Sequence, residues 1–366
     1  MRQRPIATLA LFVVTMLLVA CGGATSTATV VPPQTAATTT HAATTSATTT
    51  TAASNATPAT SAAVMRTATP GSAAATPSRA ASPAGAATPR VTTYPLTIKD
   101  DAGRDVTFAH APMHIISLAP SNTEILYALG LADRVVGVDD NSDYPAEAKA
   151  KPKVGGFAGT NLEQVVALQP DLILASGITA PDLLTALTGR NLTVVVLNPP
   201  DLPGVLADLS LVGQLADVNA QAAQVRGGLE ARIAAVATRL KNATTKPRVF
   251  FELDPTQFYT AGPHSFVDDL ITRAGGTNIA ADASTPYPTL SVEQIIAKDP
   301  EVIILSDENQ GVTPESVKAR AGWSGVSAVK NGRIAALNPD LTNRPGPRVV
   351  DALEQLALAI HPELYR

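Results

Sequence analysis

Several kinds of side chain are scarce in this sequence of 366 residues, and each shortage excludes something. Cys21 is the only cysteine, so no disulfide can form within the chain. Aromatic residues make up only 4% and charged residues 16%. Acidic residues are absent before Asp100. The segment from Arg90 onward contains 23 of the 27 basic residues and all 31 acidic residues, so its net charge is −8. Nucleic-acid binding needs a strongly basic surface, so we exclude it.

The first twenty residues combine a short basic start with an apolar run. Two arginines precede Ile6–Val19, a run of about 14 residues, whereas a membrane-spanning helix needs about 20. This pattern predicts a secretory signal peptide over residues 1–20. The closing Leu-Val-Ala-Cys21 resembles the lipobox of bacterial lipoproteins, which implies lipidation of Cys21 and an extracytoplasmic protein anchored to the cell membrane. The alternative is an unused thiol in an ordinary signal sequence.

Residues 21–92 form a segment of unusual composition, made up almost entirely of threonine, alanine, serine and proline. A segment with so few large apolar side chains cannot bury enough surface to offset its conformational entropy, which predicts disorder. A flexible chain of about 70 residues has a root-mean-square length of roughly 45 Å. We therefore expect a tether that can hold a folded domain clear of a membrane surface.

The hydrophobic pattern changes to alternation after this segment. Leu96–Ile98 and Val106–Phe108 alternate around an Asp-Ala-Gly turn, which predicts a β-hairpin. The largely apolar run His114–Leu118 follows and is typical of a strand that is buried on both faces. The folded part therefore begins with strands.

A helix is expected directly after this strand. Ser121 and Glu124 have the spacing of a capping box at a helix start, and an apolar pattern follows. Val135–Val138 predicts the next strand, which gives a β-α-β unit. Two further apolar runs, separated by helical patterns, extend this unit into a parallel sheet: Leu172–Leu174 and Val194–Leu197.

Two segments of the chain repeat one another. Asn161–Leu174 matches Ser291–Ile304, with Glu, Gln, Ala and Pro at equivalent positions. In each copy a polar capping residue starts a short helix, proline ends it, and an apolar strand follows. The repeat predicts two similar α/β lobes with parallel sheets.

One long helix is expected between the two copies. Apolar residues recur at steps of three or four from Asn219 to Lys241 without a proline. At about 1.5 Å per residue, a helix of about 20 residues spans about 30 Å. We therefore expect an N-terminal lobe over residues 93–217, a rigid connecting helix over 218–243 and a C-terminal lobe over 244–366. A stiff helix predicts only a small closing motion around a ligand cleft between the lobes.

The repeat also indicates candidate functional residues. Phe157 and Tyr287 each lie six residues before the repeated glutamate, and matched aromatic residues favour a stacking surface for a flat or bulky ligand. Aromatic caps over two loops are the alternative. Glu163 and Glu293 fall at the second position of a helix, where acidic residues are ordinary. Their duplication favours docking onto a two-fold partner that carries paired arginines.

Short motifs along the whole folded part resemble those of one family. They are Ile116-Ser-Leu-Ala-Pro-Ser-Asn-Thr-Glu124, Asp143-Tyr144-Pro145, Asn161-Leu162-Glu163, Tyr259-Thr260-Ala261-Gly262, Ala274-Gly275-Gly276, Pro286-Tyr287-Pro288 and Arg344-x-x-Pro347-Arg348. The resemblance is to the substrate-binding proteins of ABC importers for cobalamin, within a wider family that also serves ferric siderophores and haem. It implies a monomeric receptor of two lobes joined by a single helix.

The resemblance also implies roles for individual residues. Glu163 and Glu293 would dock onto arginines of a dimeric permease, whose separate ATPase supplies the energy. The residues implied to face the corrin are Phe157, Tyr259, Tyr287, Asp340 and Arg344.

Some residues depart from the pattern of the cobalamin-binding members. Asn141 and Ser176 stand where those members have aromatic residues, so a ferric siderophore or haem stays open as the ligand. Asp340 and Arg344 are four residues apart, so a mutual ion pair is an alternative to ligand contact.

An enzyme is the distant alternative, because two carboxylates about 5 to 9.5 Å apart can hydrolyse a glycoside. We expect Glu163 and Glu293 to lie much farther apart, and no nucleophile elbow, phosphate loop or cysteine nucleophile is present. The five histidines lack the spacing of a zinc site. His264 is the one candidate for an axial ligand of haem iron or cobalt, with loop capping as its alternative role. We therefore expect no catalytic residue, no metal site and no cofactor apart from the bound ligand.

Overall fold

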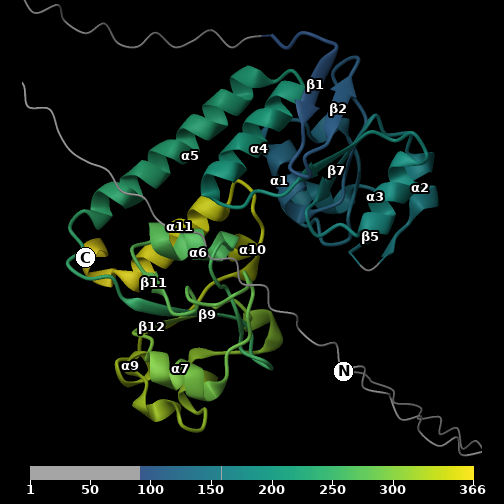
Figure 1. Cartoon of the computed structure of the whole chain (residues 1–366). Coiled ribbons are helices and arrows are strands. Elements are labelled where there is room, and N and C mark those ends of the chain that lie inside the picture. Colours follow the sequence, from purple (N-terminus) through teal and green to yellow (C-terminus); the bar gives the residue numbers. More distant parts are fainter. Residues whose placement is uncertain (1–90, 158) are drawn as a thin grey trace, which may run out of the picture. The chain divides into compact units, whose positions relative to one another are not determined.

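A computed structural model describes residues 91–157 and 159–366 of the chain (Figure 1). The signal peptide, the lipidation at Cys21 and the tether are predictions that lie outside the described residues. Within the described part, no helix combines the length and the apolar character needed to cross a membrane.

The described part begins with the expected hairpin. β1 (Leu96–Lys99) pairs antiparallel with β2 (Asp105–Phe108). The turn between them lies against the following lobe, because the N–H of Asp101 donates to the carbonyl of Val196 at 3.1 Å. The inward-facing side chains of the hairpin join the buried core of that lobe.

The N-terminal lobe is built on a parallel sheet with the strand order β4-β3-β7-β8. The strands are β3 (Ile115–Ser117), β4 (Val135–Val138), β7 (Leu172–Ser176) and β8 (Val194–Leu197). The other elements are α1 (Pro120–Ala128), α2 (Leu162–Ala167), α3 (Pro181–Thr188), α4 (Leu202–Leu215), β5 (Gly155–Gly156), β6 (Gly159–Thr160) and the 3-10 helices Ala132–Arg134 and Ala146–Ala150. Nearly every residue of the sheet is buried, which explains the continuous apolar runs in the sequence. The parallel sheet expected from the sequence is confirmed.

The start of α1 differs from the expected capping box. The helix begins at Pro120 with Ala119 at the N-cap, and no side chain caps it. Proline is well suited to the first helical position because its φ angle is already fixed, so Ser121 lies inside the first turn. Glu124 extends instead to Arg348, whose Nη2 donates to Glu124 Oε1 at 2.5 Å. The prediction of a Ser-x-x-Glu capping box was therefore wrong.

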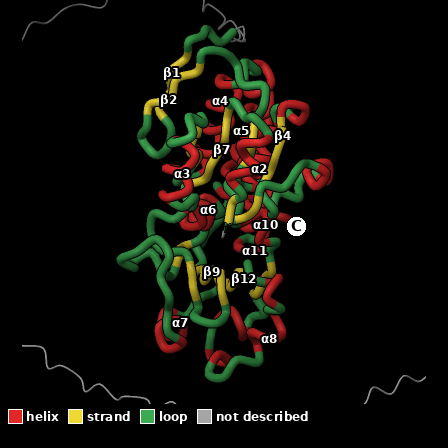
Figure 2. Tube along the Cα trace, turned by 90° about the vertical axis from the view of Figure 1, so that its right-hand side faces the viewer, coloured by secondary structure: helices red, strands yellow, loops and turns green. Residues whose placement is uncertain are grey.

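The C-terminal lobe contains a mixed sheet in which β12 lies between β9 and β13 (Figure 2). Its strands are β9 (Arg248–Asp254), β10 (Tyr259–Thr260), β11 (Thr277–Asn278), β12 (Val302–Leu305) and β13 (Ile334–Ala336). Its helices are α6 (Phe266–Arg273), α7 (Val292–Lys298), α8 (Pro314–Lys318), α9 (Ser327–Lys330), α10 (Pro339–Thr342), α11 (Val349–Ile360) and the 3-10 helices Glu308–Gln310, Trp323–Gly325 and Pro362–Tyr365. β10 pairs antiparallel with β9, unlike the expected parallel arrangement. The connection between them is a short turn, which is too short for a parallel crossover.

The long helix expected between the lobes is α5 (Asn219–Leu240), which has 22 residues. It packs against α4 of the N-terminal lobe and α11 of the C-terminal lobe. Arg232 of α5 binds two carboxylates of α11, with Nη2 at 2.5 Å from Asp351 Oδ1 and 2.7 Å from Glu354 Oε2. These ion pairs join the connecting helix directly to the C-terminal lobe.

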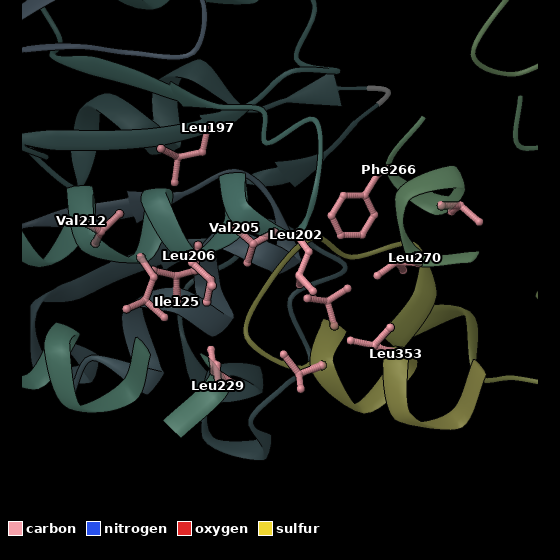
Figure 3. Close-up of a cluster of buried hydrophobic side chains, with 14 of the residues drawn as sticks. Ile125, Leu197, Leu202, Val205, Leu206, Val212, Leu229, Phe266, Leu270 and Leu353 are labelled. Carbon is pink, nitrogen blue, oxygen red and sulfur yellow. The ribbon is translucent and has the colours of Figure 1, made fainter. Parts of the chain in front are cut away.

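The two lobes also share one apolar core (Figure 3). Leu202 at the start of α4 belongs to the same buried cluster as Phe266 and Leu270 of α6 and Leu353 of α11. The N–H of Leu202 donates to Asp269 Oδ2 of α6 at 3.0 Å. Full burial of one leucine side chain contributes about 1.5 to 3 kcal/mol. The lobes are therefore joined by a packed interface as well as by the helix.

Candidate ligand site and docking surfaces

Ion pairs link α1 and the loop after β4 in the N-terminal lobe to the loop between α10 and α11 in the C-terminal lobe. Arg348 donates from Nε to Glu124 Oε2 at 3.0 Å and from Nη2 to Oε1 at 2.5 Å. Its guanidinium also lies over the ring of Tyr144, with Cζ 3.8 Å from the centroid. The Glu124 side chain is only 2% exposed, and burial raises its pKa despite the nearby arginine. This bidentate pair therefore joins the lobes in a poorly solvated position.

Arg344 lies four residues earlier in the same loop and binds two carboxylates. Its Nη1 donates to Asp143 Oδ1 of the N-terminal lobe at 2.7 Å, and its Nη2 lies 2.7 Å from Asp340 Oδ1. Burial would raise the pKa of Asp143, but hydrogen bonding to Arg344 outweighs burial and lowers this pKa below its ordinary value. The ion pair between Asp340 and Arg344, which was the alternative to ligand contact, is present. Asp143 is a third member of this group.

Gly346 allows this loop to lie directly on the N-terminal lobe. A Cβ atom at Gly346 would lie 3.2 Å from Glu124 Oε2 and 3.2 Å from the carbonyl oxygen of Ser121. Both distances are shorter than ordinary van der Waals contact, and the second involves backbone. A side chain at this position would require its neighbours to move by a few tenths of an ångström, so glycine favours the close approach of the two lobes.

The loop that carries Asp143 is held by buried polar side chains. Thr123 Oγ1 bonds to Ser117 Oγ at 2.8 Å and to Ser142 Oγ at 2.7 Å. Ser142 Oγ in turn donates to Asp139, whose pKa is raised by burial. Because each of these groups has a partner, the chain of bonds fixes the loop on the sheet.

Tyr259 and Tyr287 are brought together in the C-terminal lobe. Their rings are stacked, with centroids 6.1 Å apart and an interplanar angle of 21°. The N–H of Thr260 donates to the carbonyl of Pro288 at 3.0 Å, which aligns β10 with the segment that carries Tyr287. The rings are 39% and 44% exposed, so both present surface to solvent.

Phe157 lies in the turn between β5 and β6 of the N-terminal lobe and is 53% exposed. Gly155 has a φ of +95°, and a Cβ there would lie 2.2 Å from the carbonyl oxygen of Gly159, so the turn requires glycine. Asn141 lies beside this turn, with Nδ2 3.9 Å from the Cβ position of Gly156. Within the described residues no ring contact joins Phe157 to the tyrosine pair, so the aromatic set is divided between the lobes.

Glu124, Asp143 and Arg348 are functional candidates that the sequence does not reveal. Glu124 has the spacing of a helix cap, and Asp143 and Arg348 occur only as parts of family motifs. The one feature of the sequence that could indicate these residues is the sign of their charge. Acidic residues follow strands of the N-terminal lobe, and arginines follow the last strand of the C-terminal lobe. Ile178 is a further candidate, because it is 73% exposed in the turn after β7.

Glu163 and Glu293 occupy equivalent positions in the two repeat helices. Each is the second residue of its helix, α2 or α7, and each is exposed. Backbone hydrogen bonding and then the Ser291 hydroxyl lower the pKa of Glu293. Neither glutamate forms an ion pair with any residue in the described part of the chain.

The surroundings of the two glutamates differ. A shallow cavity of about 360 Å³ adjoins Glu163, and its lining residues are Leu162, Glu163, Val166, Ala167 and Arg190. Val166 is 45% exposed. On the other helix, Lys298 binds Asp282 at 2.7 Å. The surface beside Glu163 is therefore largely apolar, whereas the surface on α7 includes an ion pair.

Two buried carboxyl groups, those of Glu252 and Asp307, lie where β9 and β12 end. Arg320 donates to both oxygens of Glu252, at 2.6 and 2.5 Å, and its guanidinium lies over the rings of Phe258 and Trp323. Asp307 is fully buried, and neither of its carboxylate oxygens has a hydrogen-bond partner among the described residues. Burial, followed by the charge of Glu252, raises the pKa of Asp307 to about 7.

Metal-binding geometry is not found in the described part of the chain, where no three His, Cys, Asp or Glu side chains are grouped around one point. His264 is exposed and has a φ of +61° just before Ser265, the N-cap of α6. Its role as an axial ligand stays a prediction.

Comparison with known proteins places the chain in a family. Residues 115–341 match the family model described as periplasmic binding protein. The chain belongs to the periplasmic binding protein family. The family and the two-lobed α/β fold expected from the sequence are confirmed.

A substrate-binding lipoprotein, a vitamin B12 binding protein and a heme-binding protein all resemble the chain. The uncharacterized ABC transporter substrate-binding lipoprotein YvrC of Bacillus subtilis strain 168 is 34% identical over 284 residues, which covers 76% of this chain and 89% of that protein. The periplasmic vitamin B12 binding protein BtuF of Vibrio cholerae has 31% identity and a TM-score of 0.60, covering 70% of this chain and 99% of that one. The periplasmic heme-binding protein RhuT from Roseiflexus sp. RS-1 has 28% identity and a TM-score of 0.62, covering 69% and 98%.

Proposed function

We propose that this periplasmic binding protein is a lipid-anchored extracytoplasmic receptor, which binds cobalamin or a related corrinoid and delivers it to an ABC permease. The likeness to BtuF supports this ligand because it covers 70% of the chain at 31% identity. The protein performs no chemistry in this role. The corrinoid is its cargo, and a separate ATPase supplies the energy for transport.

The stacked tyrosine pair is the observation that carries the choice of a flat, bulky ligand. Tyr259 and Tyr287 present partly exposed rings, and Phe157 presents another from the opposite lobe. Aromatic contacts contribute about 0.5 to 1.5 kcal/mol beyond the area they bury. A macrocycle held between the lobes would be contacted from both sides, with Asp340 and Arg344 at its polar edge.

Calorimetric titration of the full chain in detergent tests this proposal. Cyanocobalamin and cobinamide are the probes, and haemin and a ferric siderophore are the controls. We expect tight one-to-one binding of a corrinoid and a loss of at least about tenfold in the Tyr259→Ala/Tyr287→Ala variant. Tyr365→Ala, in the C-terminal 3-10 helix, is the matched control. No response to either corrinoid, with binding of haemin or siderophore, would transfer the receptor role to the second candidate ligand class, which the likeness to RhuT favours.

Docking to the permease is proposed for Glu163 and Glu293. Both are exposed, unpaired within the described residues and equivalent by the repeat, as a two-fold partner requires. Replacing both with arginine should abolish uptake and leave corrinoid affinity intact, because like charges would then face each other. Glu147→Arg/Glu315→Arg reverses one exposed charge on each lobe away from these helices and should transport normally. Loss of affinity in the first variant would place the pair in the ligand site instead.

Lipidation of Cys21 is the remaining part of the proposal. A Cys21→Ser variant should leave the membrane fraction for the soluble extracytoplasmic fraction, while corrinoid affinity stays the same. Retention of the variant on membranes would contradict a lipid anchor at this residue.

A further inference from the structure

We infer that Asp143, Asp340 and Glu124 are specificity-determining residues, which occupy both arginines at the lobe junction and so select against ligands with anionic groups. This inference rests on the proposed function, because it takes the lobe junction as the place where the ligand binds. It goes further by naming the chemical property that separates the ligand classes.

Arg348 has little capacity left for an anionic ligand. Its Nε and Nη2 both bind Glu124, and Tyr144 covers one face of its guanidinium. The side chains of Arg348 and Glu124 are 17% and 2% exposed. An incoming carboxylate would have to displace a buried carboxylate whose other charged partner, Arg344, lies 4.0 Å away, and leaving such a group poorly paired is costly.

Arg344 is also occupied by carboxylates. Its Nη1 binds Asp143 and its Nη2 binds Asp340, each at 2.7 Å. The arginine side chain is 15% exposed, whereas the two aspartates are 45% and 39% exposed. Solvent and ligand therefore meet the carboxylates of this cluster before they meet the guanidinium.

Carboxylates outnumber guanidinium groups within the ion pairs themselves. Glu124, Asp143 and Asp340 face Arg344 and Arg348, with Lys149 and Lys153 as nearby cations and Asp139 as a further nearby acid. A ligand edge made of neutral amides, such as that of a corrinoid, can accept or donate hydrogen bonds here without displacing any ion pair. The propionates of haem would meet the exposed carboxylates of Asp143 and Asp340 and two arginines that are already ion-paired, so like-charge repulsion disfavours them.

The test compares haemin with its dimethyl ester, in which esterification removes the negative charge of both propionates and adds two methyl groups. Full-length wild type and the Asp143→Asn/Asp340→Asn variant are titrated with both probes, and the ratio of the two affinities is measured. We expect the ratio of haemin to ester affinity to rise by at least about tenfold in the variant, because Arg344 becomes available to a propionate. Asp105→Asn/Asp182→Asn makes the same change in net charge at two exposed positions and should leave the ratio unchanged.

The outcomes separate this inference from the proposed function. An unchanged ratio in a folded double variant overturns the inference, as does a wild type that already prefers haemin to its ester by the same factor. If the double variant does not fold, Asp340→Asn alone keeps the inter-lobe bond to Asp143 and should raise the ratio at least about threefold, and no rise would overturn the inference. Failure of wild type to bind cyanocobalamin overturns the proposed function but leaves the measured ratio as a valid test of selection against anions.

Discussion

The two lobes carry copies of one sequence repeat, but they contribute opposite chemistry to the junction between them. In both lobes a short capped helix precedes a fully buried strand, α2 before β7 and α7 before β12. The charged residues of the junction lie outside the repeat. Glu124 of α1 and Asp143, after β4, supply carboxylates from the N-terminal lobe, and the C-terminal lobe supplies Arg344 and Arg348, between α10 and α11.

This difference indicates that the repeat preserves the packing of helix against strand in each lobe but does not duplicate the residues of the junction. Helix and strand must pack in the same way in each lobe, so their apolar pattern persists. The segments outside the repeat are free to differ, and here their charges are complementary across the interface. The same holds for the aromatic residues: the stacked pair depends on β10, an antiparallel strand of the C-terminal lobe.

The largest loss of stability caused by a substitution is expected from breaking the inter-lobe pair of Glu124 and Arg348. Glu124→Ala leaves an arginine without its partner in a poorly solvated position and should reduce the free energy of unfolding by about 3 kcal/mol. Urea unfolding measures the loss. The double variant Glu124→Ala/Arg348→Ala should lose less than the sum of the two single variants, because each single change already breaks the same pair.

The matched control is the pair within the C-terminal lobe, Glu252 and Arg320. Its acid is equally buried and its arginine is also 17% exposed. Glu252→Ala should cost less, because Asp307 can then take over Arg320. Only the Glu124 variant should change small-angle scattering, since of these two pairs only Glu124 and Arg348 join the lobes. An equal change in scattering for both variants would contradict an inter-lobe role.

Much of the scaffold can be predicted from the sequence, because apolar periodicity reports burial directly. The parallel strands, the repeat helices and α5 all follow from it, and so do the positions of Glu163 and Glu293 on their helices. The ion pairs at the junction cannot be found in this way, since Glu124 and Arg348 are 224 residues apart. Ser-x-x-Glu fits a helix cap with the helix starting at Asn122, whereas the helix begins two residues earlier at Pro120, a residue that suits the first helical position.

Each lobe also buries one acid that is expected to make stability depend on pH. In the N-terminal lobe, burial and then the charge of Asp101 raise the pKa of Asp208 to about 8, and Asp307 in the C-terminal lobe is raised to about 7. Both pKa values lie above the ordinary value of 3.8. Between pH 3.8 and each raised pKa, the folded protein therefore binds more protons than the unfolded chain. Stability should therefore fall as pH rises from about 4 to 8, by at most about 1.4 kcal/mol per pH unit for each group.

Amide substitutions separate the two contributions. Asp307→Asn should flatten the urea-unfolding profile up to about pH 7, and Asp208→Asn should flatten it up to about pH 8, because an amide does not ionise. Asp182→Asn, at the exposed start of α3, is the control that changes net charge only. Profiles that stay parallel to wild type would show that neither buried acid titrates in this range.

The smallest effect is expected at Gly346, where the lobes touch through backbone. Gly346→Ala places a Cβ 3.2 Å from the Ser121 carbonyl and 3.2 Å from Glu124 Oε2, so the loop must move away from α1. Overpacking of this kind costs about 1 to 3 kcal/mol. Gly325→Ala is matched in chemistry but meets nothing within 4 Å, so its unfolding midpoint should stay close to that of wild type. If both variants unfold at the same urea concentration as wild type, the approach of the two lobes at Gly346 is loose, and the ion pairs beside it hold the junction without help from close backbone packing.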